Sequence, residues 1–323
     1  MSASDALLEI DDLRVEYPAR RGTVRAVDGV SLRLARGTTL GIVGESGCGK
    51  STVGQAILQL IPPPGRISGG RIVFEGQDLQ TLSQEALRRL RGDRIAMIFQ
   101  DPTATLNPVM PVGAQIAELF RWHRPELGRA DVERKVVGLL ERVGIAEPER
   151  RVHAYPHELS GGMRQRVVIA CALALDPALV VADEPTTALD VTVQAQILEL
   201  ARSLQQERGT ALILISHDLG VIAEMCDRVA VMYAGAVVEA GPVDDVLENP
   251  RHPYTKGLIA SRPRIEQPDQ EIRPIPGSVP DLAHPPAGCP FHPRCALADA
   301  TCRTTAPVLR AIGAQDVACH KAA

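Results

Sequence analysis

The chain has 323 residues, a formal net charge of −4 and 45% hydrophobic residues, which is close to ordinary globular usage. This length exceeds one average domain, so we expect one large domain with an appendage. The slightly negative charge gives no overall reason to expect nucleic-acid binding, and no stretch approaches the roughly 20 apolar residues that span a bilayer. The acidic N-terminus lacks a basic segment followed by an apolar run, so the sequence predicts a cytosolic protein without a secretory signal.

Short apolar runs in the first part of the chain are typical of β-strands. The last of them is apolar throughout, as in a strand buried on both faces, and it leads into a glycine-rich loop. Helical spacing follows the loop from Ser51 to Ile61, where Pro62 stops it. The predicted strands are 8–10, 13–17 (ended by Pro18), 27–34 and 39–43.

The middle of the chain is predicted to be helical and then to return to strands. Helical spacing runs from about 109 to 144, and we interpret it as part of a helical insertion that continues to about Leu175. Buried strands are predicted at 179–182 and 211–215, with a helix at 193–207 between them. Strands that alternate with helices indicate an α/β fold with a mainly parallel sheet.

Composition changes beyond Ser261, where proline recurs and periodicity fades. We interpret this region as a linker and a small loop-rich tail that does not continue the sheet. The predicted division is therefore a main domain at 7–260, with a helical subdomain at about 103–175, and a tail at 261–323.

The glycine-rich loop matches the phosphate-binding pattern G-x-x-x-x-G-K-[ST] and stands between a predicted strand and a predicted helix, which is the context that the motif requires. Glycines let backbone N–H groups wrap around phosphates, and the helix presents its positive end to them. Lys50 would neutralise the β- and γ-phosphates of a nucleoside triphosphate, and the hydroxyl of Ser51 would ligate Mg²⁺. The nucleotide-contacting residues are Gly44, Glu45, Ser46, Gly47, Cys48, Gly49, Lys50, Ser51 and Thr52.

Cys48 within this loop has two interpretations. A thiol near a helix N-terminus can have a lowered pKa and be sensitive to oxidation. It can also simply be a small residue at a variable position of the motif, and we favour that interpretation.

Two carboxylates end the predicted strand at 179–182. Asp183 is placed to hold Mg²⁺, through water, and Glu184 is placed to polarise the attacking water. Adjacent acids at a strand end are often only a solvated turn, but a phosphate loop in the same chain favours the catalytic interpretation.

A further motif resembles one family. Leu159-Ser160-Gly161-Gly162-Met163-Arg164-Gln165-Arg166 resembles the signature of ABC-type ATPases, and Ser160 can cap the apolar helix that follows. The resemblance implies nucleotide contacts from Ser160, Gly161 and Gly162. The other family motifs occur in the family's order: Gln100 resembles the Q-loop residue that senses Mg²⁺ and the attacking water, Asp190 the D-loop residue, His217 the switch histidine, and Tyr17 the aromatic residue that stacks on adenine.

In this family the signature of one subunit closes the ATP site of another. The sequence holds one phosphate loop and one signature, so the resemblance implies a dimer with a second, homologous ATPase chain. ATP binding would close that dimer, and hydrolysis would reopen it. The implied fold is the ABC-type P-loop NTPase, an α/β domain with a helical subdomain and a small tail.

Several passages resemble the ATPases of oligopeptide and dipeptide importers, among them Phe99-Gln100-Asp101-Pro102 and His252-Pro253-Tyr254-Thr255. The resemblance covers nearly the whole chain and implies ATP-driven uptake of peptides at the cytoplasmic face of the membrane. The implied partners are two transmembrane permease subunits, a different ATPase subunit and an external peptide-binding protein. Nickel and glutathione importers belong to the same group and remain alternatives for the substrate. A non-transport ABC ATPase is disfavoured because no sustained heptads separate the two ATP motifs.

Four cysteines gather in the tail. Cys289, Cys295, Cys302 and Cys319 form a C-x5-C-x6-C-x16-C series, and in a reducing compartment such a cluster suggests a metal before disulfides. Four thiolates can hold a [4Fe–4S] cluster or a zinc ion. Similar tails of peptide-importer ATPases are associated with an iron–sulfur cluster, which we take as the expectation. The alternatives are zinc and four buried thiols without metal.

Overall fold

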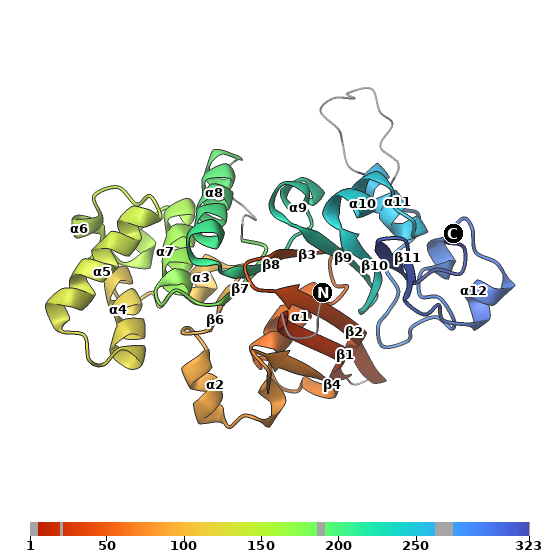
Figure 1. The fold of residues 1–323 in the computed structure, drawn as a ribbon, viewed down its shortest axis with the longest axis horizontal. Coiled ribbons are helices and arrows are strands. Elements are labelled where there is room, and N and C mark those ends of the chain that lie inside the picture. The colour runs from red at the N-terminus through yellow and green to blue at the C-terminus, as the bar shows by residue number, and fades with distance from the viewer. Residues whose placement is uncertain (1–5, 20–21, 186–190, 262–273, 323) are drawn as a thin grey trace. The chain divides into compact units, whose positions relative to one another are not determined.

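The structure is a computed structural model that describes residues 6–19, 22–185, 191–261 and 274–322 (Figure 1). The chain divides into two compact units. The first unit contains residues 1–34, 39–80 and 214–323, and the second contains 35–38 and 81–213. Each is described separately below. The boundary falls within β8 (Ala211–Ile215), whose residues are all buried.

A four-stranded sheet forms one layer of the first unit, in the order β2-β1-β4-β5, and its β1–β4 and β4–β5 pairs are antiparallel. The two predicted strands at 8–10 and 13–17 are one long strand that continues past Pro18. The pairing of β1 with β4 is irregular between Asp11 and Arg14. This irregularity accommodates Asp12, which has a φ of 47°, and the strand continues beyond it. The strands are β1 (Ala6–Ala19), β2 (Gly22–Ala35), β4 (Arg66–Phe74) and β5 (Gln77–Asp78).

Of the second sheet, the strands that lie in this unit follow the order β11-β12-β10-β9-β3. β3 pairs with β9 in parallel, and all five residues of β3 are buried, as its continuous apolar sequence predicts. The neighbouring β9–β10, β10–β12 and β11–β12 pairs are antiparallel. The strands are β3 (Thr39–Val43), β9 (Arg228–Tyr233), β10 (Ala236–Pro242), β11 (Arg310–Ile312) and β12 (Gln315–Val317).

The pairing of β12 corrects the expectation that the tail does not continue the sheet. Glu239 and Ala240 of β10 pair with Val317 and Asp316 of β12, and Val317 is fully buried. The edge of β10 has unpaired backbone groups that β12 satisfies, and this long-range pairing gives no local periodicity in a proline-rich sequence. The tail therefore supplies two short strands to the sheet that contains β3.

Short helices complete the first unit. The helix after the glycine-rich loop ends at Ile57, earlier than the predicted Ile61, because Gln59 adopts a φ of 53° that an α-helix does not allow. These helices are α1 (Lys50–Ile57), α9 (Leu219–Met225), α10 (Val243–Glu248), α11 (Pro253–Ala260) and α12 (Ala300–Thr304), with a 3₁₀ turn η3 at His292–Arg294; a further 3₁₀ turn, η1 (Leu79–Thr81), lies at the boundary between the units.

The second unit is mostly helical. Its strands β6 (Ile95–Ile98) and β7 (Leu179–Asp183) pair in parallel and are buried throughout. The predicted helical stretch at 109–144 is two helices, α4 and α5, whose apolar faces carry buried residues such as Ile116, Phe120 and Leu140. The helices are α2 (Gln84–Leu90), α3 (Pro102–Thr105), α4 (Val112–His123), α5 (Arg129–Arg142), α6 (Pro148–Arg151), α7 (Gly161–Leu173) and α8 (Val191–Arg208), with a 3₁₀ turn η2 at Pro156–Glu158.

Among the described residues, every helix is too short or too polar to cross a membrane.

Candidate functional site

The glycine-rich loop of the first unit joins β3 to α1, as the motif requires (Figure 1). Gly44 and Gly49 have φ values of 153° and 102°, and a Cβ atom at these positions would lie 2.2 Å from the carbonyl oxygen of Met232 and 2.1 Å from that of Ala26. Only glycine fits at both points. The tight loop therefore depends on the two motif glycines.

Lys50 begins α1, and its ammonium group lies inside the loop. Its Nζ atom donates to the carbonyl oxygens of Gly44 at 2.8 Å and of Glu45 at 3.0 Å, and the residue is only 5% exposed. The N-cap residue of α1 is Gly49, so no side chain caps the start of this helix. A buried cation and an uncapped helix start form a site that favours an anion. Ser46 and Gly47 are exposed, whereas Ser51 and Thr52 are half-buried on α1.

The Cys48 side chain is fully buried beside this lysine, with its sulfur 3.8 Å from Lys50 Nζ. Burial raises the pKa of the Cys48 thiol, and the nearby ammonium lowers it by less. This thiol is therefore a packed small residue, as favoured from the sequence, because a reactive cysteine needs a lowered pKa and access to solvent.

Two other predicted residues lie in the first unit. Tyr17 is a half-buried residue of β1, and a Cβ atom at Gly65 would lie 2.4 Å from its ring, so the ring packs closely on that glycine. His217 follows β8 and is exposed, in a turn where the Asp218 backbone N–H donates to the Ser216 hydroxyl at 2.9 Å. The predicted adenine-stacking and switch roles of Tyr17 and His217 remain predictions.

The second unit brings two predicted catalytic residues together. The Gln100 side-chain amide donates to the carboxylate of Glu184 at 3.0 Å, although 84 residues separate them in the sequence. Asp183 ends β7 and is 4% exposed, whereas Glu184 is half-buried with a φ of 47°. The next turn is fixed by a buried contact in which the Gln165 amide donates to the carbonyl oxygen of Pro185 at 2.8 Å. The strand end therefore carries two adjacent carboxylates, one of them bonded to an amide, and carboxylate oxygens are groups that can bind water or Mg²⁺.

The signature segment starts α7 as predicted. The Ser160 hydroxyl accepts a bond from the backbone N–H of Met163 at 3.3 Å, which caps the helix. Ser160 and Gly161 are exposed, and a Cβ atom at Gly161 would meet nothing within 4 Å. Gly162 is half-buried. The start of α7 is therefore accessible to another molecule. Asp190 lies outside the described residues.

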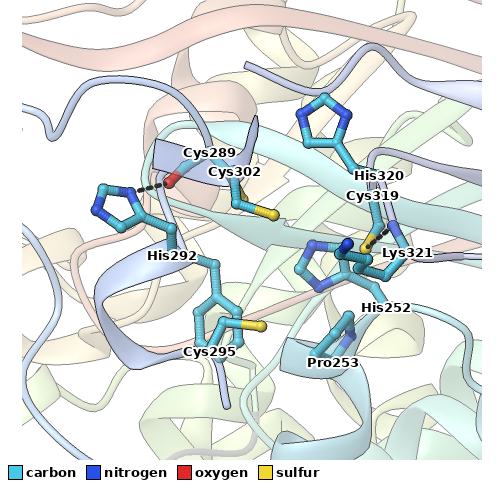
Figure 2. A pocket seen from close by; sticks show the side chains of 10 residues that line it. His252, Pro253, Cys289, His292, Cys295, Cys302, Cys319, His320 and Lys321 are labelled. Atoms are coloured by element: carbon cyan, nitrogen blue, oxygen red, sulfur yellow. Dashed lines mark hydrogen bonds between the residues drawn. The ribbon is translucent and has the colours of Figure 1, made fainter. Parts of the chain in front are cut away.

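The four cysteines of the tail line one small cavity, together with His252 and His320. Figure 2 shows the sulfur atoms of Cys295, Cys302 and Cys319 turned toward the same space. Burial raises the pKa of the Cys289 and Cys295 thiols, and the neighbouring thiols raise it further. Where the structure describes the chain, no three His, Cys, Asp or Glu side chains are gathered as ready ligands for a metal ion.

An ion pair that sequence reasoning missed connects this region with the phosphate loop. The guanidinium group of Arg294 bonds both carboxylate oxygens of Glu45, at 2.7 and 3.0 Å. The two residues are 249 positions apart, and no local pattern signals their contact.

Comparison with known proteins agrees with these motifs. Residues 27–187 match the family described as "ABC transporter", and residues 238–302 match "Oligopeptide/dipeptide transporter, C-terminal region". The oligopeptide transport ATP-binding protein OppD of Bacillus subtilis (strain 168) is 54% identical over 294 residues, which cover 90% of this chain and 82% of that protein. The dipeptide transport ATP-binding protein DppD of the same strain is 49% identical, over 90% of this chain and 87% of that protein.

Solved structures show the same fold. The dimeric post-hydrolysis state of the ATP-binding cassette MJ0796, bound to ADP and Pi, has a TM-score of 0.67 at 26% identity and covers 73% of this chain and 98% of that chain. The cbiO1 protein of Clostridium perfringens, part of an ABC transporter complex, has a TM-score of 0.64 at 30% identity and covers 76% of this chain and 92% of that chain.

Proposed function

This chain belongs to the ATP-binding subunits of ABC-type oligopeptide and dipeptide transporters, and from its site we propose which residues bind and hydrolyse ATP. Within that family it is the ATP-hydrolysing subunit of a peptide importer, for which ATP and Mg²⁺ are expected. The observation that carries the assignment of residues is the buried Lys50 ammonium within a loop that only glycines can form.

In the proposed site, residues 44–52 bind the phosphates of ATP, with Lys50 balancing their negative charge. Ser51, Asp183 and Gln100 hold the Mg²⁺ ion, directly or through water, because oxygen donors suit this cation. Tyr17 stacks on the adenine. Glu184 accepts a proton from the attacking water, and its bond from the Gln100 amide orients the carboxylate. His217 contacts the γ-phosphate.

The signature segment, in this proposal, acts on a nucleotide held by another ATPase subunit. The exposed, capped start of α7 supports this role, because backbone N–H groups at a helix N-terminus attract phosphate. Ser160, Gly161 and Gly162 would contact that nucleotide, and Asp190 would cross the interface. Permease subunits and a dimeric ATPase are implied by the family. We propose two permeases, one different ATPase chain and an external peptide-binding protein, with this chain bound peripherally at the cytoplasmic face.

Replacing Glu184 with Gln tests the catalytic assignment. The assembled transporter should bind ATP normally but lose at least about 100-fold in turnover, because general acid–base catalysis contributes about 10²–10⁴. The control is Glu199→Gln, which changes an exposed carboxylate on α8 and should keep normal turnover. Near-normal turnover in Glu184→Gln would show that another group is the base. Failure of the wild-type chain to co-purify with membrane permeases would contradict the transport role.

We further propose that the cysteine cavity holds a [4Fe–4S] cluster. The donor set supports this: four thiols and no carboxylate line the cavity, beside His252, His292 and His320. A four-iron cluster is wider than one ion, so its ligands need not converge on a single point as zinc ligands do. When bound, the cluster would cross-link Cys289, Cys295, Cys302 and Cys319 and so stabilise the tail.

Anaerobic purification tests this proposal. We expect about four irons and four sulfides per chain, with absorption typical of an iron–sulfur protein, and loss of both in Cys295→Ser. Cys171→Ser changes a cysteine outside the tail and should retain the iron. A colourless, iron-free protein with full ATPase activity would overturn the proposal of a cluster. One bound zinc ion per chain would show that the cavity holds zinc instead.

A further inference from the structure

The Arg294–Glu45 pair joins the cysteine segment to the proposed phosphate site within one compact unit. Arg294 Nη1 donates to Glu45 Oε2 at 2.7 Å, and Nη2 donates to Oε1 at 3.0 Å, so the guanidinium group binds the carboxylate in a bidentate manner. The Arg294 side chain is 5% exposed, and the Glu45 side chain is 27% exposed. A bidentate, largely buried pair is stronger and better oriented than a surface ion pair.

The arginine is itself held rigidly by the tail. Its Nε atom donates to the carbonyl oxygen of Pro276 at 2.8 Å, and its guanidinium group lies 5.8 Å from the centre of the Tyr233 ring. It ends the 3₁₀ turn η3, directly before Cys295, where its backbone N–H donates to the carbonyl oxygen of Phe291 at 3.0 Å. The position of the guanidinium group therefore depends on the packing of the cysteine segment.

Glu45 is also anchored through its backbone. Its N–H donates to the hydroxyl of Tyr254 at 2.8 Å, and its carbonyl oxygen accepts from Lys50 Nζ at 3.0 Å. Tyr254 is fully buried in α11. The second residue of the phosphate loop is thus fixed at its N–H, its carbonyl and its carboxylate, and the carboxylate contact comes from the tail.

The charge of Glu45 needs such a partner. A triphosphate in this loop carries several negative charges, and an unpaired carboxylate on the second loop residue would repel them. We propose that Arg294 is a positioning residue of the ATP site: it neutralises Glu45 and holds its side chain, so that the loop accepts ATP. This inference rests on the proposed phosphate site at residues 44–52.

Equilibrium binding of ATP to the full-length chain tests the inference, with displacement of a fluorescent ATP analogue as the readout. Arg294→Ala should raise the Kd for ATP about tenfold, which corresponds to about 1.4 kcal/mol. Adding Glu45→Gln to Arg294→Ala should restore the Kd to within about threefold of wild type, because it removes the unpaired charge. In the assembled transporter, Arg294→Ala should raise the KM for ATP more than it lowers kcat.

Salt gives a second readout of the same charge. The Kd of Arg294→Ala divided by the wild-type Kd should fall toward one as ionic strength rises, because salt screens the repulsion between the Glu45 carboxylate and the phosphates. The control is Arg310→Ala, since Arg310 donates within the tail, to the Ala322 carbonyl oxygen at 2.8 Å and the Cys319 carbonyl oxygen at 3.5 Å. Its Kd for ATP should equal the wild-type value.

Three outcomes would overturn the inference. They are a Kd for Arg294→Ala within twofold of wild type, a raised Kd that Glu45→Gln does not restore, and an equal rise in Arg310→Ala. If Arg294→Ala does not fold, Arg294→Lys replaces it, with an expected Kd rise of about threefold, since lysine keeps the charge but not the bidentate grip. A wild-type chain that binds no ATP would instead refute the phosphate site itself. Lys50→Ala tests that site independently, because it removes the ammonium group that would balance the charge of the phosphates.

Discussion

The aromatic cluster beneath the tail gives a prediction whose size follows from the structure. Phe291, four residues before Cys295, packs edge-on against Tyr233 with ring centres 5.2 Å apart, and its ring lies 5.5 Å from Tyr254. Phe291 is 4% exposed, and both tyrosines are fully buried. The phenylalanine therefore joins the tail to β9 and α11 through a closed apolar contact.

Replacing Phe291 with alanine should destabilise the protein by about 4 kcal/mol. A buried Phe→Ala change costs about 3–5 kcal/mol, because it removes apolar surface and leaves a cavity. Each ring pair contributes about 0.5–1.5 kcal/mol within that total. The loss is a large part of the roughly 5–15 kcal/mol that stabilises a typical native protein.

Urea denaturation followed by circular dichroism measures the effect, under reducing and anaerobic conditions for wild type and variant alike. Leu297→Ala is the control, because Leu297 lies in the same tail but is 57% exposed, and its loss should cost no more than about 0.5 kcal/mol. A Phe291→Ala protein within about 1 kcal/mol of wild type would refute the packing argument. It would mean that the tail does not depend on this cluster.

Three further predictions concern the loop and the sheet. Because burial raises the pKa of Cys48, iodoacetamide should label it more slowly at pH 8 than an ordinary thiol, with a rate that still climbs above pH 9; fast labelling at pH 8 in native protein would contradict this. Gly49→Ala should abolish ATP binding, since its Cβ would lie 2.1 Å from the Ala26 carbonyl oxygen, and a normal Kd would show that the loop adapts. Val317→Asp should lower the thermal midpoint by more than about 5 °C, because it places a carboxylate at a fully buried position of β12, whereas Val308→Asp, at an exposed site, should not.

Features that depend on local chemistry could be predicted from the sequence. Strand β3, the glycine-rich loop, strands β7 and β8 and the Ser160 cap are confirmed, because each is specified by a short run of neighbouring residues. The family and the ATPase activity follow from the order of these motifs, and the comparisons confirm them. The roles of Tyr17, Asp190 and His217 stay predictions.

Features that depend on distant residues could not be predicted in this way. Strands β4 and β6 were not predicted, and the exclusion of the tail from the sheet was wrong, because their pairing partners lie far apart in the chain. Strands β9 and β10 were also missed, although they form a local hairpin in which Tyr233 pairs with Ala236. The Arg294–Glu45 contact likewise spans two segments without shared periodicity. The clustering of four cysteines was visible, but only the structure shows that all four line one cavity.

The pairing of β12 with β10 also bears on how the chain is made. During synthesis β10 leaves the ribosome well before β12, so one edge of this sheet has no neighbour while the intervening segment is still being translated. Exposed strand edges recruit other chains, and chaperones act on such intermediates. A newly made subunit therefore completes its fold only when the tail arrives, and products of interrupted translation would carry an open edge that marks them for aggregation or destruction.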